Sequence, residues 1–177
     1  MATNLQFIHK ETISGSTSTT NVTSCFTSDY DVYKIYSTGI STAGTDYVDL
    51  NMRLIDSGGS VISDNEYNYA NLNMLTWTSF TETSSENQSS FLRAFSESTD
   101  QAPESQGGEI TVYNPNSSSS YTFITYANSQ KYGGSYMTGL KGIGVHTVAE
   151  TITGFQLLES NGSRPYSSGV ILVYGVK

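Results

Sequence analysis

Apolar and polar residues alternate along most of this chain with a period of two, which is typical of strands that have one buried face and one solvent-facing side. The clearest example is 45–55, TDYVDLNMRLI. Its apolar positions all fall on one face: Val48, Leu50, Met52 and Leu54. The pattern stops at DSGGS, a turn signal, so a short strand at 60–63 is expected to pair back on it.

Further segments with strand character follow along the chain. They are 29–38, 76–82, 89–97, 109–114, 120–127, 141–150, 152–159 and 169–176. The last, GVILVYGV, is a continuous apolar run and is expected to be buried on both sides. Turn sequences separate several of these segments, such as the Asn-Pro-Asn and serine run at 114–120 and the Ser-Asn-Gly-Ser at 160–163.

Nine or ten short strands with these turns predict an all-β fold, an antiparallel β-sandwich of jelly-roll-like type with about eight to ten strands. An immunoglobulin-like sandwich needs only about 100 residues, and this chain has 177. No linker divides the chain, so residues 21–177 are expected to form a single sandwich domain. Residues 1–20 are patterned more weakly and predict an N-terminal strand or an arm that reaches a neighbouring subunit.

Charge and composition exclude several classes of function. The chain has 16 acidic and 8 basic residues, a net charge of -8, and such a surface repels a phosphate backbone, so no nucleic acid is expected as a partner. No stretch approaches the roughly 20 apolar residues of a spanning helix, so no membrane insertion is expected. The single cysteine, Cys25, has no basic neighbour and is expected to be a small core residue, not a reactive thiol.

Few residues could carry catalysis, and we expect no enzyme. The two histidines, His9 and His146, accompany no G-x-S-x-G sequence, so a Ser-His-Asp hydrolase is not indicated. His146 lies in an expected strand, and a surface or partly buried position is predicted for it. The sequence also does not place any two carboxylates across a cleft, as glycoside hydrolysis requires.

No cofactor and no metal ligand is assigned, because one cysteine and two histidines make a zinc site unfavourable. A calcium ion is the more plausible metal, since oxygen-rich loops suit it. The sequence DSGGSVISD at 56–64 and the following Asn65 and Glu66 offer carboxylate and carbonyl oxygens. The loop is therefore a candidate for calcium binding, with no ligand assigned.

Aromatic side chains are the remaining candidates for binding. Tyr67, Tyr69, Tyr132 and Tyr136 lie in or near expected loops. Exposed rings can either pack at subunit contacts or stack on sugar faces, and contacts are the preferred interpretation. Trp77, in LTWTSF, is expected to be a core anchor instead.

Several segments together resemble small virion structural proteins of marine tailed bacteriophages, including cyanophages, of the capsid decoration or fibre type. They are MATNLQFI, SCFTSDYDVYKI, NPNSSSSYTF, TITGFQLLESNG and SSGVILVYGVK. In that family an opening strand leads to an x-D-Y-D-x-Y strand, and a final strand that starts at a glycine ends in a Tyr-Gly pair, here Tyr174 and Gly175. The similarity spans most of the chain, and its motifs are structural, not catalytic.

The resemblance implies a jelly-roll-like sandwich on the exterior of a phage particle, assembled in the host cytoplasm. The expected function is therefore that of a non-enzymatic virion structural protein, a capsid decoration or head-fibre protein. Its expected partners are other virion proteins, either the major capsid protein or neighbouring subunits in a homo-oligomer such as a trimer. The alternative is a tail-fibre or adaptor component that binds host surface glycans through its loop aromatics.

Overall fold

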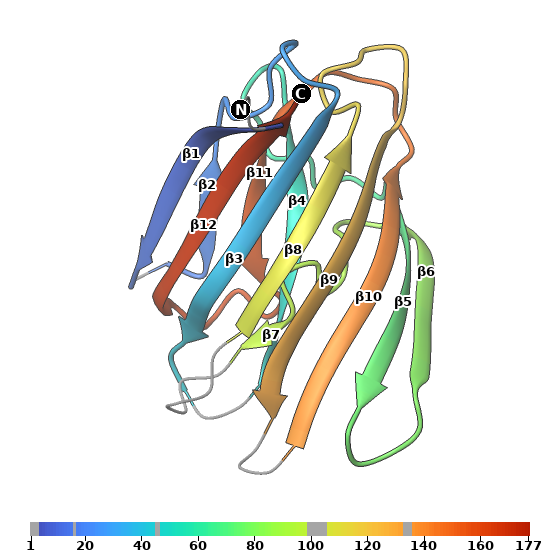
Figure 1. The fold of residues 1–177 in the computed structure, drawn as a ribbon. Helices are drawn as coiled ribbons and strands as arrows, with labels where there is room; N and C mark the ends of the chain where they lie inside the picture. The colour runs from blue at the N-terminus through green and yellow to red at the C-terminus, as the bar shows by residue number, and fades with distance from the viewer. Residues whose placement is uncertain (1–3, 16, 45–46, 99–105, 133–135) are drawn as a thin grey trace.

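The computed structural model describes residues 4–15, 17–44, 47–98, 106–132 and 136–177, and all of its regular structure is β-strand. Two antiparallel sheets lie face to face, so the predicted all-β sandwich is confirmed (Figure 1). The large sheet has eight strands, in the order β1 (Leu5–Ser14), β12 (Tyr166–Val176), β3 (Val32–Thr42), β8 (Gln106–Tyr113), β9 (Thr122–Tyr132), β10 (Tyr136–His146), β5 (Tyr67–Leu75) and β6 (Thr81–Gln88). The small sheet has four, in the order β2 (Thr19–Val22), β11 (Ile152–Glu159), β4 (Val48–Asp56) and β7 (Glu97–Ser98).

The strand order is that of a jelly roll with two added hairpins. Without β5–β6 and β9–β10, eight strands remain. If these eight are counted in chain order, the large sheet has the order first-eighth-third-sixth and the small sheet has the order second-seventh-fourth-fifth. That is the arrangement in which two Greek keys form a double sheet. The two hairpins, which we call the hairpin extension, continue the large sheet beyond β8 (Figure 1). They also explain why the structure has more strands than the sequence predicted.

The apolar core lies on the inner side of the large sheet, under the small sheet, and it continues into the hairpin extension through Ile124 and Leu140. The inner face predicted for β4 is confirmed, since its four apolar side chains are all buried. On β3, Tyr33 and Ile35 are buried opposite it, and the ring of Phe26 packs on Tyr33 at a centroid distance of 4.8 Å. Cys25 is buried beside them as predicted, and burial raises the pKa of its thiol from 9.0 to about 12.

The first two strands of the chain each form an edge of one sheet. β1 pairs with β12, and β2 pairs with β11. Ile13 is buried against the core, whereas most of the other β1 side chains are exposed or half-buried. Residues 5–14 and 19–22 therefore take the form of strands that belong to the sandwich itself.

Two predicted strands are wrong. Segment 76–82 is mostly the turn between β5 and β6, and Trp77 is 40% exposed there instead of anchoring the core. Segment 89–97 is irregular, because Arg93 and Ser96 have positive φ angles of 53° and 84° that a strand does not tolerate. The segment at 60–63 forms only an isolated bridge between Val61 and Ile55.

Strand β12 is buried on one side only, contrary to the prediction from its apolar sequence. Ile171 and Val173 face the core, whereas Val170, Leu172 and Tyr174 are half-buried on the opposite face. That opposite face is the outer side of the large sheet, which the small sheet does not cover. The apolar run therefore reflects an apolar outer surface and not a second core.

Strand β5 was not predicted, because two of its inward positions are asparagines. Asn71 and Asn73 face inward and are buried, and an inward asparagine removes the alternation that marks a strand. The inner face of the hairpin extension is covered by residues 89–96, which we call the crossing segment. The irregular backbone of this segment provides carbonyl groups that the buried polar side chains bind.

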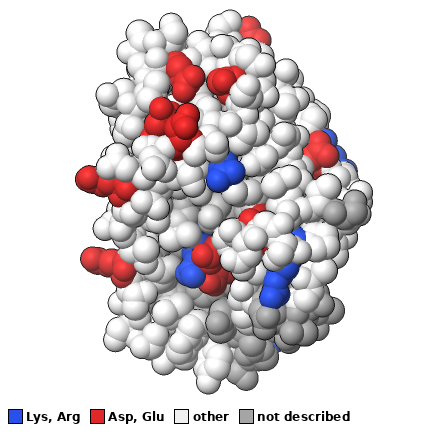
Figure 2. Space-filling model, turned by 180° about the vertical axis from the view of Figure 1, so that it is seen from behind, with Lys and Arg blue, Asp and Glu red and all other residues white. Residues whose placement is uncertain are grey.

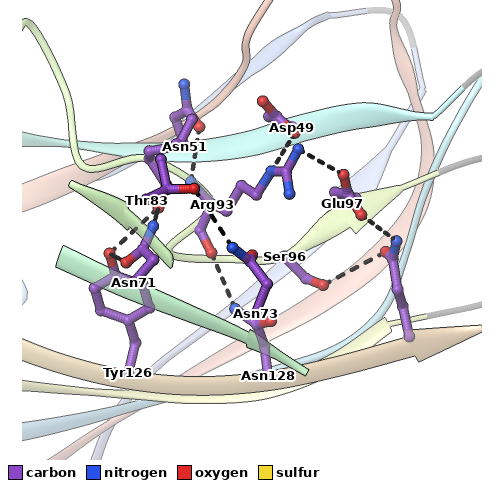
Figure 3. A network of polar contacts seen from close by, with 12 residues as sticks. Asp49, Asn51, Asn71, Asn73, Thr83, Arg93, Ser96, Glu97, Tyr126 and Asn128 are labelled. Atoms are coloured by element: carbon purple, nitrogen blue, oxygen red, sulfur yellow. Dashed lines mark hydrogen bonds and ion pairs between the residues drawn. The ribbon is translucent and has the colours of Figure 1, made fainter. Parts of the chain in front are cut away.

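These polar contacts form a network between the two layers (Figure 3). The Tyr126 hydroxyl donates to Asn71 Oδ1 at 2.5 Å, and Asn71 Nδ2 donates to the Leu92 carbonyl at 3.2 Å. Asn128 Nδ2 donates to the Arg93 carbonyl at 2.9 Å. Both polar atoms of the Asn71 amide are paired, whereas Asn128 Oδ1 has no hydrogen-bond partner among the described residues. The bonds that these amides donate fix the position of the crossing segment.

Arg93 connects the same network to the edge of the small sheet (Figure 3). Its guanidinium binds Asp49 at 2.6 Å and Glu97 at 2.9 Å, and its backbone N–H donates to Asn51 Oδ1. Burial raises the pKa of the Glu97 carboxyl above its ordinary value, although the Arg93 charge opposes the shift. The extension is therefore held to the rest of the protein by polar contacts as well as by buried apolar side chains such as Ile124 and Leu140.

Candidate functional site

The outer side of the large sheet, which we call the outer face, carries a continuous apolar row. Strand register aligns one residue from each of six adjacent strands: Leu5, Val176, Val32, Tyr113, Phe123 and Val145. Six strands at about 4.8 Å spacing make this row about 24 Å long. A row of this kind on a solvent-facing sheet surface is unusual, because alternation normally places polar residues there.

Large apolar side chains project from this face next to the row. Phe123 is 48% exposed and Ile143 is 60% exposed. At the β1 end, the rings of Phe7, Tyr174 and Tyr36 form a chain of edge-to-face contacts with centroid distances of 5.7 and 5.9 Å. Exposed apolar area that extends across neighbouring strands marks an interaction surface more often than isolated residues do.

A shallow groove of about 690 Å³ runs along the outer face over β3, β8, β9, β10, β5 and β6. Its lining includes two basic residues, Lys34 and Lys141, and two acidic residues, Glu82 and Glu109. Lys34 Nζ lies 3.7 Å from Glu109 Oε2. The charges in the groove balance, whereas the whole chain carries a net charge of -8.

The ends of the two added hairpins bring a second group of aromatic residues together. The rings of Trp77 and Tyr136 lie 5.1 Å apart, and Phe80, in the same turn as Trp77, is 65% exposed. Thr76 fixes this arrangement, since its hydroxyl accepts from the Met137 N–H at 2.9 Å. Tyr136 is an exposed ring, in line with its predicted place in or near a loop, whereas the prediction that Trp77 anchors the core is wrong.

The other predicted aromatics have different positions. Tyr67 is fully buried at the start of β5, where its hydroxyl donates to the Ile62 carbonyl and accepts from the Leu54 N–H. The expectation that Tyr67 contacts a partner or a sugar is therefore wrong. Tyr69 is a half-buried inward residue of β5 that packs on the core. Tyr132 ends β9 and pairs with Tyr136, and its side chain lies outside the described part of the chain.

A separate cluster of titratable groups lies where β10 ends and β5 begins. His146, the last residue of β10, is completely buried, so the prediction of a surface or partly buried position is wrong. Its ring faces inward against Tyr67, and its Nε2 lies 3.1 Å from Glu66 Oε2 and 3.7 Å from Glu150 Oε1. One ligand atom from each of the three residues lies within 4.8 Å of the other two.

The electrostatics of this cluster are strongly negative. Figure 2 shows acidic side chains gathered at one end of the face seen from behind, the end at which β10 ends and β5 begins. Burial raises the pKa of the Glu150 carboxyl, and the nearby charges of Glu66 and Asp56 add to the increase, while His146 opposes it. The sequence offered no signal for this cluster, because Glu66 and His146 are 80 residues apart.

The loop considered for calcium contributes only one member to this cluster. Glu66 belongs to it, whereas Asp56 and Asp64 do not. Asp56 Oδ1 instead accepts a hydrogen bond from the Ser60 N–H at 2.9 Å, which closes the turn after β4. Glu66 is therefore grouped with possible metal ligands from a distant segment, His146 and Glu150, and not with other residues of its own loop.

The described residues contain no helix that is long and apolar enough to cross a membrane. Comparison with protein-family models, with curated proteins and with solved structures gives no match to this chain. Three features of the structure therefore bear on function: the outer face, the hairpin ends, and the cluster of Glu66, His146 and Glu150.

Proposed function

We propose that this chain is a non-enzymatic structural protein on the exterior of a bacteriophage particle, a capsid decoration or head-fibre protein that assembles through its outer face. The observation that carries the proposal is the apolar row across six strands, with Phe123 and Ile143 exposed beside it. A jelly-roll domain with such a face can pack against a neighbour without changing its fold. The resemblance to phage virion proteins agrees with this interpretation.

The area available is sufficient for a stable contact. Eight strands at about 4.8 Å spacing and a length of nine residues give a face of about 34 by 30 Å, or about 1,000 Å². A standard protein interface buries about 800 Å² on each partner. The outer face is therefore large enough for one interface of ordinary size.

Charge favours a second copy of the same chain as the occupant of this face. Two copies that approached through acidic surfaces would repel, because each carries a net charge of -8. The groove on the outer face instead combines Lys34 and Lys141 with Glu82 and Glu109. Basic groups of one copy can face acidic groups of the other, so this side offers self-association with the least repulsion.

The test is the oligomeric state of the purified protein, measured by light scattering after size exclusion and by native mass spectrometry. The wild type should form a homo-oligomer, and Phe123→Asp or Ile143→Asp should shift it to monomer. Phe80→Asp is the matched control, since Phe80 is more exposed than either residue but lies at the hairpin end. A monomeric wild type at about 100 μM, or an unchanged oligomer in both variants, would overturn assembly through this face.

The location on a particle needs its own measurement. Quantitative mass spectrometry of purified virions should find hundreds of copies for a capsid decoration protein. A few copies to tens of copies would instead indicate a position at a vertex or on the tail. Absence of the chain from virions would overturn the proposal as a whole.

One observation favours the second candidate function, a tail-fibre or adaptor component that binds host surface glycans. Trp77 and Tyr136 form an exposed aromatic pair at the ends of two hairpins, and such rings can stack on sugar faces. Glycan-array binding that is lost in Tyr136→Ala but kept in Tyr121→Ala, a ring of equal exposure elsewhere, would support this candidate. No binding to host envelope glycans would remove it.

A further inference from the structure

We propose that Glu66, His146 and Glu150 form a binding site for a divalent transition-metal ion of the zinc class, which ties together two connections between the sheets. The proposal concerns a different part of the molecule from the outer face and does not depend on the proposed function.

The distances between the donor atoms suit one metal ion. Tetrahedral zinc with bonds of about 2.0–2.1 Å places its ligand atoms about 3.3 Å apart. The distances from His146 Nε2 to the two carboxylate oxygens are 3.1 Å and 3.7 Å, on either side of this value. All three donor atoms lie within 4.8 Å of one another, so small side-chain shifts are enough to close the site around an ion.

The type and charge of the donors also favour a metal. One imidazole and two carboxylates supply a charge of -2, which a divalent ion would neutralise. Among the described residues, no Lys or Arg forms an ion pair with Glu66 or Glu150, so their mutual repulsion is not relieved in that way. An imidazole ligand favours zinc and its neighbours over calcium and magnesium, which prefer oxygen alone.

The cluster combines a buried histidine with two carboxylates that solvent can reach. His146 is completely buried, and its ring points Nε2 at the two carboxylates. The side chains of Glu66 and Glu150 are half-buried, so an ion and its remaining water ligands can reach the site from solvent. His146 Nδ1 has no hydrogen-bond partner among the described residues, and a metal-bound histidine usually has one. We therefore expect an affinity about 10–100-fold weaker than that of a site with such a partner.

The position in the fold shows what the ion would stabilise. Glu66 ends the connection from β4 in the small sheet to β5 in the large one, and Glu150 lies in the connection from β10 back to β11. The Thr147 N–H and hydroxyl already donate to the Glu66 carbonyl at 2.8 and 2.9 Å. With a single cysteine, the chain cannot form an internal disulfide, and a metal ion would cross-link these two connections in its place.

The test is isothermal titration of the chelator-treated full chain with ZnCl₂, together with thermal unfolding with and without the ion. The wild type should bind one zinc per chain and unfold at a higher temperature in its presence. Glu150→Gln should weaken binding at least tenfold and abolish the thermal shift, as should Glu66→Gln. Both variants change half-buried surface carboxylates and should fold.

Glu11→Gln is the matched control. His9 and Glu11 form a pair with the same 3.1 Å distance, and the described part of the chain places no third ligand beside them, so this variant should bind zinc like the wild type. The proposal is overturned if the wild type binds no zinc, if Glu150→Gln binds as tightly as the wild type, or if Glu11→Gln loses the binding. Tighter binding of calcium than of zinc would also overturn it, because that preference requires an all-oxygen site.

Discussion

Phe91 connects the crossing segment to both layers of the sandwich, and its truncation tests how the hairpin extension is held. The side chain is fully buried, and its ring packs edge-on against Tyr67 at a centroid distance of 4.8 Å. Its backbone exchanges two hydrogen bonds with Met52 of β4, of 2.9 and 3.1 Å. Phe91→Ala keeps these backbone bonds, so the variant removes the contribution of the ring alone.

The surroundings of the ring determine the size of the effect. A Cβ added to Gly144 would lie 2.6 Å from two ring atoms of Phe91, so the ring rests directly on the glycine backbone of β10. No side chain at this position can move into the cavity after truncation. Buried Phe→Ala changes cost about 3–5 kcal/mol, and sites that cannot collapse lie toward the upper end of that range. We therefore expect Phe91→Ala to lower the free energy of unfolding by about 4 kcal/mol.

For a domain of this length, a loss of that size lowers Tm by about 8–16 °C. Urea unfolding followed by far-UV circular dichroism measures the loss in the free energy of unfolding. Tryptophan fluorescence is less suitable, because the single tryptophan, Trp77, lies in an exposed turn and reports only that hairpin end. Phe80→Ala, which truncates an exposed ring, should change stability by less than about 0.5 kcal/mol. If Phe91→Ala does not fold, Phe91→Leu should show a smaller loss in the same direction. A loss below about 1.5 kcal/mol for Phe91→Ala would refute the reasoning.

Three further predictions concern single buried groups. Cys25, with its pKa raised to about 12, should react with a thiol reagent only after unfolding, and rapid labelling of the native protein at pH 8 would contradict this. Burial raises the pKa of Glu97 above 4.5 in the folded state, so its protonated form stabilises the fold at low pH, and this contribution is lost as the pH rises through the folded-state pKa. The free energy of unfolding of Glu97→Gln, measured with urea at several pH values, should therefore fall less steeply above pH 4.5 than that of the wild type. Parallel profiles for the two proteins would show that folding does not raise the pKa of Glu97. Tyr126→Phe removes the hydroxyl that donates to Asn71 and should cost about 1–2 kcal/mol in urea unfolding, whereas an unchanged midpoint would mean that this bond contributes nothing.

The sequence predicted those parts of the fold in which local alternation and burial agree. The faces of β3 and β4 follow directly from it, since Ile35 and Leu50 alternate with more polar neighbours and point into the core. Turn residues separate the strands, and no helical period competes with them. These signals depend only on neighbouring residues, so they can be read without knowledge of the partner strand. The sandwich class and its jelly-roll type followed from them.

Strand β5 and the crossing segment show where such reasoning fails. The inward positions of β5 include two buried asparagines. Asn71 donates to the carbonyl of Leu92, a residue 21 positions later, whereas Asn73 donates to Thr81 and Thr83 of β6. Phe91 and Phe95 look like residues of a strand, but they belong to an irregular segment whose position is fixed by contacts with remote side chains. A buried polar residue reveals its environment only through its partner, and that partner is far away in the sequence.

The candidate sites also depend partly on local sequence and partly on contacts between distant segments. The sequence alone shows a composition that favours strands, few titratable groups and several aromatic residues that could form contacts. Tertiary structure alone decided which aromatics are exposed, by burying Tyr67 and leaving Tyr136 at a hairpin end. It also decided that Glu66, His146 and Glu150 meet, because two crossings between the sheets end at the same place. Alternation is a property of neighbouring residues, whereas a site depends on which distant segments the topology brings together.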